Sequence, residues 1–175
     1  MKSSIRFATL ALLATAPAVA HATVYLTLEQ AQGQMLPGQH LTPITITLTD
    51  AQIGAIVKDS GEKPLSRDLK AWKATDGSWF ILDQVVGKHE FITYAVALDH
   101  AGAVKDIEIL DYRETFGGQV REAGWRSQFN GKRHGDSLKL GKDIRNISGA
   151  TLSSKHVTDG VRRLLSTYAI ALAGK

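Results

Sequence analysis

The stretch SWFILDQVVGKHEFITYAVALDHAGAVKDIEILDY, residues 78–112, decides the fold of this chain. Runs rich in β-branched and aromatic residues lie within it, at 78–86, 91–99 and 103–112. A further run, 70–75, precedes it across Asp76-Gly77, a pair typical of tight hairpin turns. Consecutive strands joined by short turns predict an antiparallel β-meander, with one face covered by helices and the other partly solvated.

Helix signals lie on both sides of this meander. Before it, capping-box patterns begin two short helices, expected over 27–35 and 49–61, with a strand over 44–49 between them. After it, apolar residues spaced three and four apart predict a final helix from about Ser154 to Leu172. Strands in the middle and helices at both ends predict a single α+β domain, in which the sheet packs against N-terminal and C-terminal helices.

Conspicuous side chains near the C-terminal end have simple packing interpretations. Trp125 and Phe129 are four residues apart in a short helix expected within 113–132, so they are interpreted as core residues rather than ligand-stacking residues. The pair Arg162-Arg163 is expected on the solvated face of the last helix.

Residues 1–22 have the pattern of an export signal. A positively charged start precedes an apolar run too short to span a bilayer comfortably, and residues 20–22 read Ala-His-Ala, a small-x-small cleavage pattern. The sequence therefore predicts a cleavable signal peptide, cut after Ala22, and a periplasmic protein made of residues 23–175. An uncleaved N-terminal anchor is the alternative.

Charge and cysteine content exclude several classes of function. The formal charge is only +4 over 175 residues and no run of five basic residues occurs, so nucleic acid is not an expected partner. Without cysteine the chain has no disulfide, thiolate metal site, cysteine-held iron–sulfur cluster or covalent haem. The histidines show no metal-ligand spacing, and serine-hydrolase and Walker motifs are missing. Neither a metal site nor a catalytic residue is predicted, and the chemistry is expected from oxygen and nitrogen ligands or a bound organic cofactor.

The segment ISGATLSSKH, residues 147–156, concentrates small and hydroxyl-bearing residues just before the last helix. A helix N-terminus offers free N–H groups and partial positive charge, and glycine and alanine leave room beside it, so the segment is a candidate phosphate site. Its hydroxyls can donate to phosphate oxygens or form an ester with one. The simpler interpretation is a turn followed by an N-cap at Ser153 or Ser154, and physical considerations alone favour it.

This segment closely resembles the flavinylation motif, Ser-Gly-Ala-Thr-x-Ser/Thr, of the FMN-binding domain family. Members of that family include the C subunit of the sodium-translocating NADH:quinone reductase and the G subunit of the Rnf complex, and their FMN is joined to the threonine by a phosphoester. The resemblance implies that Thr151 is the acceptor for covalent FMN. It also implies cofactor contacts from the surrounding Ser148, Gly149, Ala150, Leu152 and Ser153.

The resemblance extends upstream and covers roughly residues 78–165. RETFGGQV (113–120) and WRSQFNGK (125–132) look like the family's turn with Glu-Thr-Pro-Gly and its downstream Gln-Phe-x-Gly-Lys. Further flavin contacts are thereby implied for Glu114, Thr115, Gly117 and Gly118. For the glycine pair, a plain strand-to-helix turn stays an equal alternative.

Two positions differ from the family's pattern. Arg145 stands six residues before Thr151, where the family usually has an acidic residue, and Asp143 lies two residues further back. The turn at 115–118 reads Thr-Phe-Gly-Gly, without the family's proline.

The resemblance implies an exported electron-transfer flavoprotein rather than an enzyme. Its FMN would be attached by a separate FAD:protein FMN transferase, and its electrons would be exchanged with a membrane or periplasmic redox protein. Two alternatives stay open. One is a non-covalent flavin- or ligand-binding module, which Arg145 favours. The other is a flavin-dependent reductase, which no acid–base pair near Thr151 supports, although His156 lies in the first turn of the expected helix.

Overall fold

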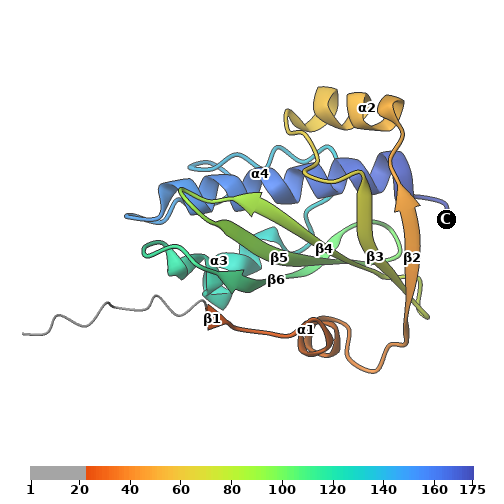
Figure 1. Cartoon of the computed structure of the whole chain (residues 1–175), viewed down its shortest axis with the longest axis horizontal. Helices are drawn as coiled ribbons and strands as arrows, with labels where there is room; N and C mark the ends of the chain where they lie inside the picture. The colour runs from red at the N-terminus through yellow and green to blue at the C-terminus, as the bar shows by residue number, and fades with distance from the viewer. Residues whose placement is uncertain (1–22) are drawn as a thin grey trace, which may run out of the picture.

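The computed structural model describes residues 23–175, so the expected signal peptide lies outside the described residues. Six strands form one antiparallel sheet in the order β1-β6-β5-β4-β3-β2 (Figure 1). Along the chain they are β1 (Thr23–Val24), β2 (Leu41–Thr47), β3 (Asp68–Ala74), β4 (Trp79–Val86), β5 (Phe91–Leu98) and β6 (Val104–Tyr112). The predicted meander is confirmed as β3 to β6, and the α+β class is confirmed with it.

The two outer strands complete the sheet. β2 pairs with β3 along its whole length and contains Pro43, which gives this edge strand one N–H donor fewer. At the opposite edge β1, only two residues long, pairs with the end of β6. The sequence contains no alternating run that would have predicted β1.

Four α-helices surround this sheet. They are α1 (Leu28–Met35), α2 (Asp50–Ser60), α3 (Ala123–Arg126) and α4 (Thr151–Thr167). Short 3₁₀ turns, Gly118–Arg121 and Ser127–Phe129, flank α3, and a π-helical turn, Tyr168–Leu172, continues α4. Both predicted capping boxes are present at the starts of α1 and α2. None of the helices in the described part of the chain is long and apolar enough to cross a membrane.

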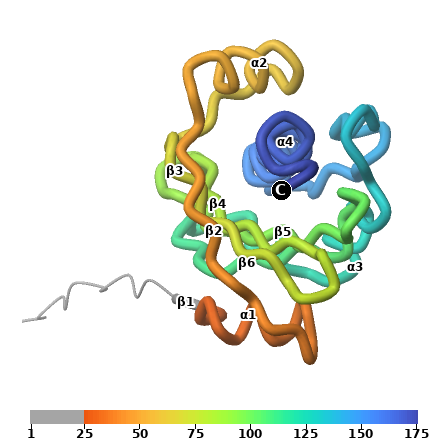
Figure 2. The backbone as a smooth tube through the Cα atoms, turned by 90° about the vertical axis from the view of Figure 1, so that its right-hand side faces the viewer, coloured from red at the N-terminus to blue at the C-terminus, as the bar shows by residue number. Residues whose placement is uncertain are grey.

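The core has a layer on each face of the sheet. Helix α4 runs along one face, between α2 and the strands, and buries its apolar stripe there (Figures 1 and 2). Trp125 and Phe129 are buried in this layer, which confirms their interpretation as core residues. On the opposite face α1 packs over Phe80, Ala95 and Leu110. Helix α1 therefore covers part of the second face, which was expected to be partly solvated.

The start of the last helix corrects a prediction. α4 begins at Thr151, three residues earlier than expected, and Ala150 occupies the N-cap without a side-chain hydrogen bond. Ser153 and Ser154 lie inside the first turn, so the predicted N-cap at one of them is wrong. Gly149 adopts φ +80° and the Ala150 N–H donates to the Ile147 carbonyl oxygen, 3.0 Å away, so a tight turn leads directly into the helix.

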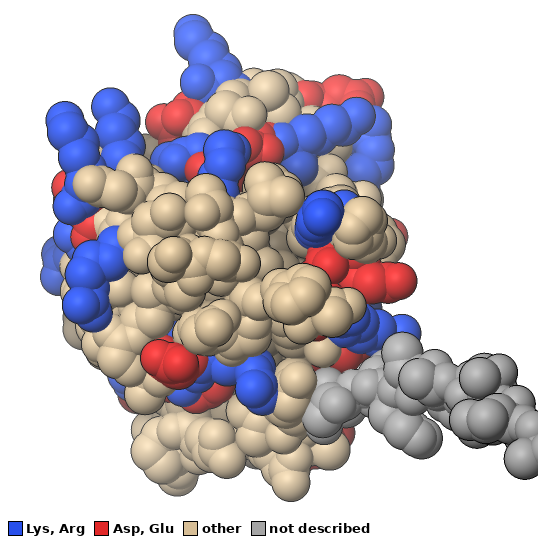
Figure 3. All heavy atoms as spheres, turned by 90° about the vertical axis from the view of Figure 1, so that its left-hand side faces the viewer, with Lys and Arg blue, Asp and Glu red and all other residues tan. Residues whose placement is uncertain are grey.

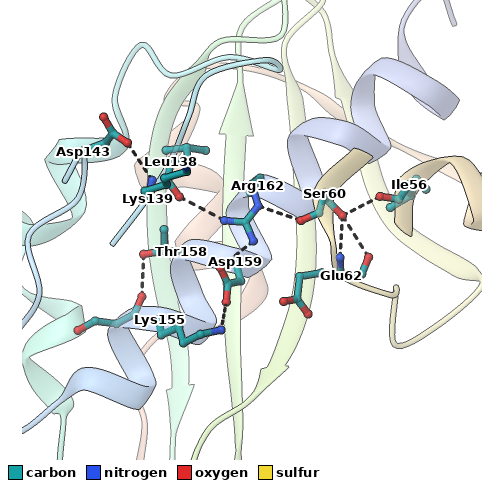
Figure 4. A network of polar contacts seen from close by, with 11 residues as sticks. Ile56, Ser60, Glu62, Leu138, Lys139, Asp143, Lys155, Thr158, Asp159 and Arg162 are labelled. Atoms are coloured by element: carbon teal, nitrogen blue, oxygen red, sulfur yellow. Dashed lines mark hydrogen bonds and ion pairs between the residues drawn. The ribbon is translucent and has the colours of Figure 1, made fainter. Parts of the chain in front are cut away.

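The arginine pair on α4 also differs from its prediction, because neither side chain is simply solvated. Arg163 is only 4% exposed, and its guanidinium donates to the Asp83 carboxylate at 2.7 Å. Arg162 is partly buried, and Figure 4 shows it reaching from α4 to the carbonyl oxygens of Ser60 and Leu138 at 2.9 and 3.3 Å. These arginines thus fasten α4 to the sheet, to the end of α2 and to the loop before the candidate site.

Candidate functional site

Three segments that are distant in sequence meet where α4 begins. They are the β4–β5 turn, the loop that follows β6 and the Gly149–Ala150 turn with the first residues of α4. They enclose a cavity of about 400 Å³, lined by Lys88, His89, Glu114, Thr115, Phe116, Gly149, Ala150, Thr151, Leu152 and Ser153. In Figure 1 this end of the molecule lies on the left, and Figure 3 views it directly: a broad area free of Lys, Arg, Asp and Glu is bordered by charged side chains.

The loop after β6 is held against α4 by one tyrosine. The Tyr112 hydroxyl donates to the Phe116 carbonyl oxygen and lies 2.9 Å from the Ser153 hydroxyl. Gly117 follows with φ +96°, and a side-chain carbon there would lie 2.9 Å from the Ser153 oxygen and 3.3 Å from the Ala150 Cβ. Only glycine gives this conformation and this close approach together. Burial, the largest cause, raises the pKa of Tyr112, so the phenol stays protonated as a donor at neutral pH.

Glu114 connects the same loop to the β4–β5 turn. Its carboxylate accepts hydrogen bonds from the backbone N–H groups of His89 and Glu90, at 2.6 and 3.0 Å. Burial alone raises the pKa of Glu114, but these N–H groups together outweigh burial and hold that pKa below its usual range. The carboxylate is therefore ionised at neutral pH, and its charge is directed at the turn that it fixes.

The start of α4 provides the chemistry for an anion. The first intrahelical bond is donated by the Ser154 N–H to the Ala150 carbonyl oxygen at 2.9 Å, so the N–H groups of Thr151, Leu152 and Ser153 precede it. The first turn contains no acidic residue. A side-chain carbon placed on Gly149 would meet nothing within 4 Å, so the cavity is open beside this backbone. N–H groups, helix dipole and open space together suit a phosphate group.

The Thr151 side chain is exposed at the edge of this cavity. Asn146 Nδ2 donates to its hydroxyl oxygen at 3.1 Å. Arg145 contacts Gln128 instead: its backbone N–H and its Nε lie 2.8 and 3.3 Å from Gln128 Oε1. Asp143 accepts from the Lys139 N–H (Figure 4) and from the Ser137 hydroxyl, so it stabilises the preceding loop. The Thr151 hydroxyl is therefore contacted by Asn146, and not by Arg145 or Asp143.

Apolar surface completes the cavity. Phe116 is 79% exposed and Leu152 is 44% exposed, both on the cavity wall. A planar aromatic ligand would cover such surface and so remove it from water. Phosphate chemistry at one end and exposed apolar side chains nearby are the two features that FMN requires.

Most residues predicted for the site line this cavity or the hollow next to it. Gly117 and Gly118 line the adjoining hollow, of about 590 Å³, which shares Thr115 and Phe116 with the first cavity. Ser148 lies in the turn before α4, exposed to solvent, and does not line either cavity.

Sequence reasoning missed Lys88, His89, Phe116 and Asn146 as site residues. Lys88 and His89 reach the site because β4 pairs with β5, and no local sequence motif predicts that they lie there. Asn146 is not part of the family's motif and directly follows Arg145. Only its hydrogen bond to the Thr151 hydroxyl identifies it as a site residue. Among residues 23–175, no group of three or more His, Asp or Glu side chains is placed to hold a metal ion.

Comparison with known proteins agrees with this geometry. The family model described as the FMN-binding domain matches residues 87–166, a range that starts at the β4–β5 turn and ends within α4. No curated protein sequence matches the chain. The matched range contains all three segments of the cavity, so the part of the chain that builds this site matches the FMN-binding domain family.

Proposed function

We propose that this protein is an electron-carrying flavoprotein whose FMN is joined to Thr151 by a phosphoester bond. The observation that carries the proposal is the position of the Thr151 hydroxyl: exposed, at the first residue of α4, and on the wall of the 400 Å³ cavity. A cavity of this volume is in the range of ordinary small-molecule sites, about 300–1,000 Å³. The first N–H groups of α4 would hold the phosphate of an FMN joined to this oxygen.

The attachment reaction balances with FAD as the donor. FAD is FMN joined to AMP through a phosphoanhydride, and an FAD:protein FMN transferase moves the FMN phosphoryl group to the threonine oxygen. The bond from phosphorus to Thr151 Oγ1 forms, the phosphoanhydride breaks, and AMP leaves while the hydroxyl loses its proton. Asn146 orients the hydroxyl by donating to it at 3.1 Å, which leaves the hydroxyl's own proton directed elsewhere.

The flavin supplies the redox chemistry when bound, since it takes up one or two electrons, and the protein supplies its position and surroundings. The Glu114 carboxylate fixes the β4–β5 turn, and the Tyr112 hydroxyl fixes the loop that carries Phe116. On this proposal the protein is a carrier rather than an enzyme, acting outside the cytoplasm after removal of residues 1–22. Its electrons are exchanged with a membrane or periplasmic redox protein.

A mass measurement on denatured protein tests the covalent bond. Protein made together with the transferase is expected to keep one FMN-phosphoryl adduct after denaturation, and Thr151→Ala to lose it completely. Thr45→Ala is the matched control, because it removes an exposed threonine hydroxyl on β2, outside the motif and both hollows, and is expected to keep the adduct. An adduct that persists in Thr151→Ala disproves the assignment of the acceptor.

The same experiment separates the alternative function. A wild-type protein that never gains the adduct, yet binds added FMN reversibly, is a non-covalent flavin-binding module. Arg145 at the position where the family usually has an acidic residue is the feature that favours this alternative.

A further inference from the structure

The Phe116 ring is the most exposed large apolar side chain among residues 23–175, at 79% exposure. A single exposed phenylalanine is ordinary on a protein surface when its backbone is free to move. Here the backbone is held, because the Phe116 carbonyl oxygen accepts from the buried Tyr112 hydroxyl and the next residue is the tightly packed Gly117. A fixed backbone therefore presents a solvent-exposed aromatic ring.

The ring stands between two hollows. Phe116 lines the 400 Å³ cavity that contains Thr151 and also the adjoining 590 Å³ hollow. Leu152, 44% exposed, lies on the same cavity wall one residue beyond the proposed acceptor. These two apolar side chains thus come from different segments, and both are available to the same ligand.

We propose that Phe116 packs against the isoalloxazine ring of the FMN carried on Thr151. This inference rests on the proposed function and deepens it by assigning the residue that holds the flavin ring. The phosphate end is fixed at the start of α4, so the ring system must lie within the length of its ribityl chain, where Phe116 offers a flat apolar surface. Aromatic rings gain from offset or edge contacts in addition to the burial of apolar area. Since the turn has phenylalanine where the family has proline, this contact belongs to this chain.

A contact-dependent fluorescence measurement tests the proposal on flavinylated protein. Tryptophan in van der Waals contact with an excited flavin quenches its emission by electron transfer, so Phe116→Trp is expected to lose most of the flavin fluorescence. Phe91→Trp is the matched control: Phe91 is also an exposed phenylalanine, at 51%, but it lines neither hollow, and its replacement is expected to leave the emission unchanged. In Phe116→Ala the flavin is expected to become more accessible, with a higher iodide quenching constant than in wild type and in Phe91→Ala.

Each outcome decides a different point, provided that the adduct mass is measured first. A missing adduct in wild-type protein overturns the proposed function and this inference with it. A normal adduct whose emission is the same in Phe116→Trp and Phe91→Trp overturns this inference alone. Unchanged iodide quenching in Phe116→Ala, together with slower reduction by a donor protein, also overturns it and identifies the ring as a partner contact.

Discussion

Gly117 is the residue on which the geometry of the site depends most directly. It combines a left-handed backbone, φ +96°, with close packing against Tyr112, Ser153 and Ala150. We expect Gly117→Ala to lower the free energy of unfolding by about 2–4 kcal/mol, since backbone strain and a steric clash add together. Urea denaturation measures this loss.

Gly149→Ala is the control that measures the cost of backbone strain alone. Gly149 also has positive φ, +80°, but a side-chain carbon there meets nothing within 4 Å. Its replacement is therefore expected to cost only the strain of the left-handed conformation, about 1–2 kcal/mol. Equal losses for the two variants would show that the close approach at Gly117 contributes nothing.

At the residue scale the sequence indicated which segment lines the cavity, but not the contacts that its side chains make. Thr151 and its small neighbours form a contiguous motif, and the structure places most of them on one cavity wall. The N-cap was predicted wrongly because Ser153 and Ser154 have typical capping side chains. Tertiary structure uses one of them differently: the Ser153 hydroxyl pairs with Tyr112, 41 residues away in sequence. Local propensity contains no information about such a partner.

At the scale of elements, Glu114 makes the position of the β4–β5 turn depend on pH. The N–H groups of the turn hold the pKa of Glu114 below its usual value of 4.5, after burial has partly opposed them. Because the folded-state pKa is depressed, the stabilisation is fully present above about pH 4.5 and is lost as pH falls through the folded-state pKa. We expect wild-type protein to be more stable than Glu114→Gln at neutral pH.

The pH dependence of that difference is the measurement. The stability difference between wild type and Glu114→Gln should narrow steadily as pH falls below about 4.5. Amide hydrogen exchange at His89 and Glu90, the two N–H groups that the carboxylate accepts from, should be faster in the variant at neutral pH. A difference in stability that stays constant down to acidic pH would show that the carboxylate does not fix this turn.

Element boundaries were predicted well where the signal is local. The capping boxes fixed the starts of α1 and α2, and alternation fixed the four strands of the meander. The start of α4 was placed three residues too late, because helix propensity alone does not show that Gly149 turns the chain sharply enough to begin a helix at Thr151. The two-residue β1 exists through its pairing with β6, which sequence periodicity does not reveal.

At the scale of the whole molecule, Arg163 connects three parts of the fold. Its guanidinium donates to the Asp83 carboxylate at 2.7 Å, to the Gln84 carbonyl oxygen at 2.9 Å and to the Lys63 carbonyl oxygen at 3.3 Å. We expect Arg163→Leu to lower the free energy of unfolding by about 3–5 kcal/mol, because it removes the cation beside a partly buried carboxylate and leaves only the Tyr94 hydroxyl and the Gln84 N–H as its donors. Thermal or urea unfolding provides the value.

Arg162→Leu is the neighbouring control. Arg162 is more exposed, with 29% of its side chain accessible against 5% for Arg163. Its loss is expected to cost about 1–2 kcal/mol, since its charged partner Asp159 keeps a second ion pair with Lys155 at 2.6 Å. If the double variant Arg163→Leu/Asp83→Leu is no more stable than Arg163→Leu, the unpaired carboxylate is not the source of the cost.

The overall architecture was predictable because strand alternation and helix periodicity agree along the chain. The position of α1 on the second face was not predictable, since the sequence of a short helix of low amphipathicity does not indicate which face of a sheet the helix covers. Nor did the pattern of charged residues predict that Arg163 is buried. Its partner Asp83 is 80 residues away in sequence, and only the packing of α4 on β4 brings the two together.

The borders of the sheet have a consequence for how this chain behaves in a crowded compartment. An open β-sheet border is a template on which another polypeptide can add itself and start aggregation. One border here is β2, where Pro43 interrupts the series of donors. The other is β6: the two-residue β1 pairs with its end, and Arg126, Gly131 and Lys132 hydrogen-bond to its backbone at Ile107 and Val104. Neither offers a long, regular row of hydrogen-bonding groups to a second copy, so the sheet is protected from self-association at both borders.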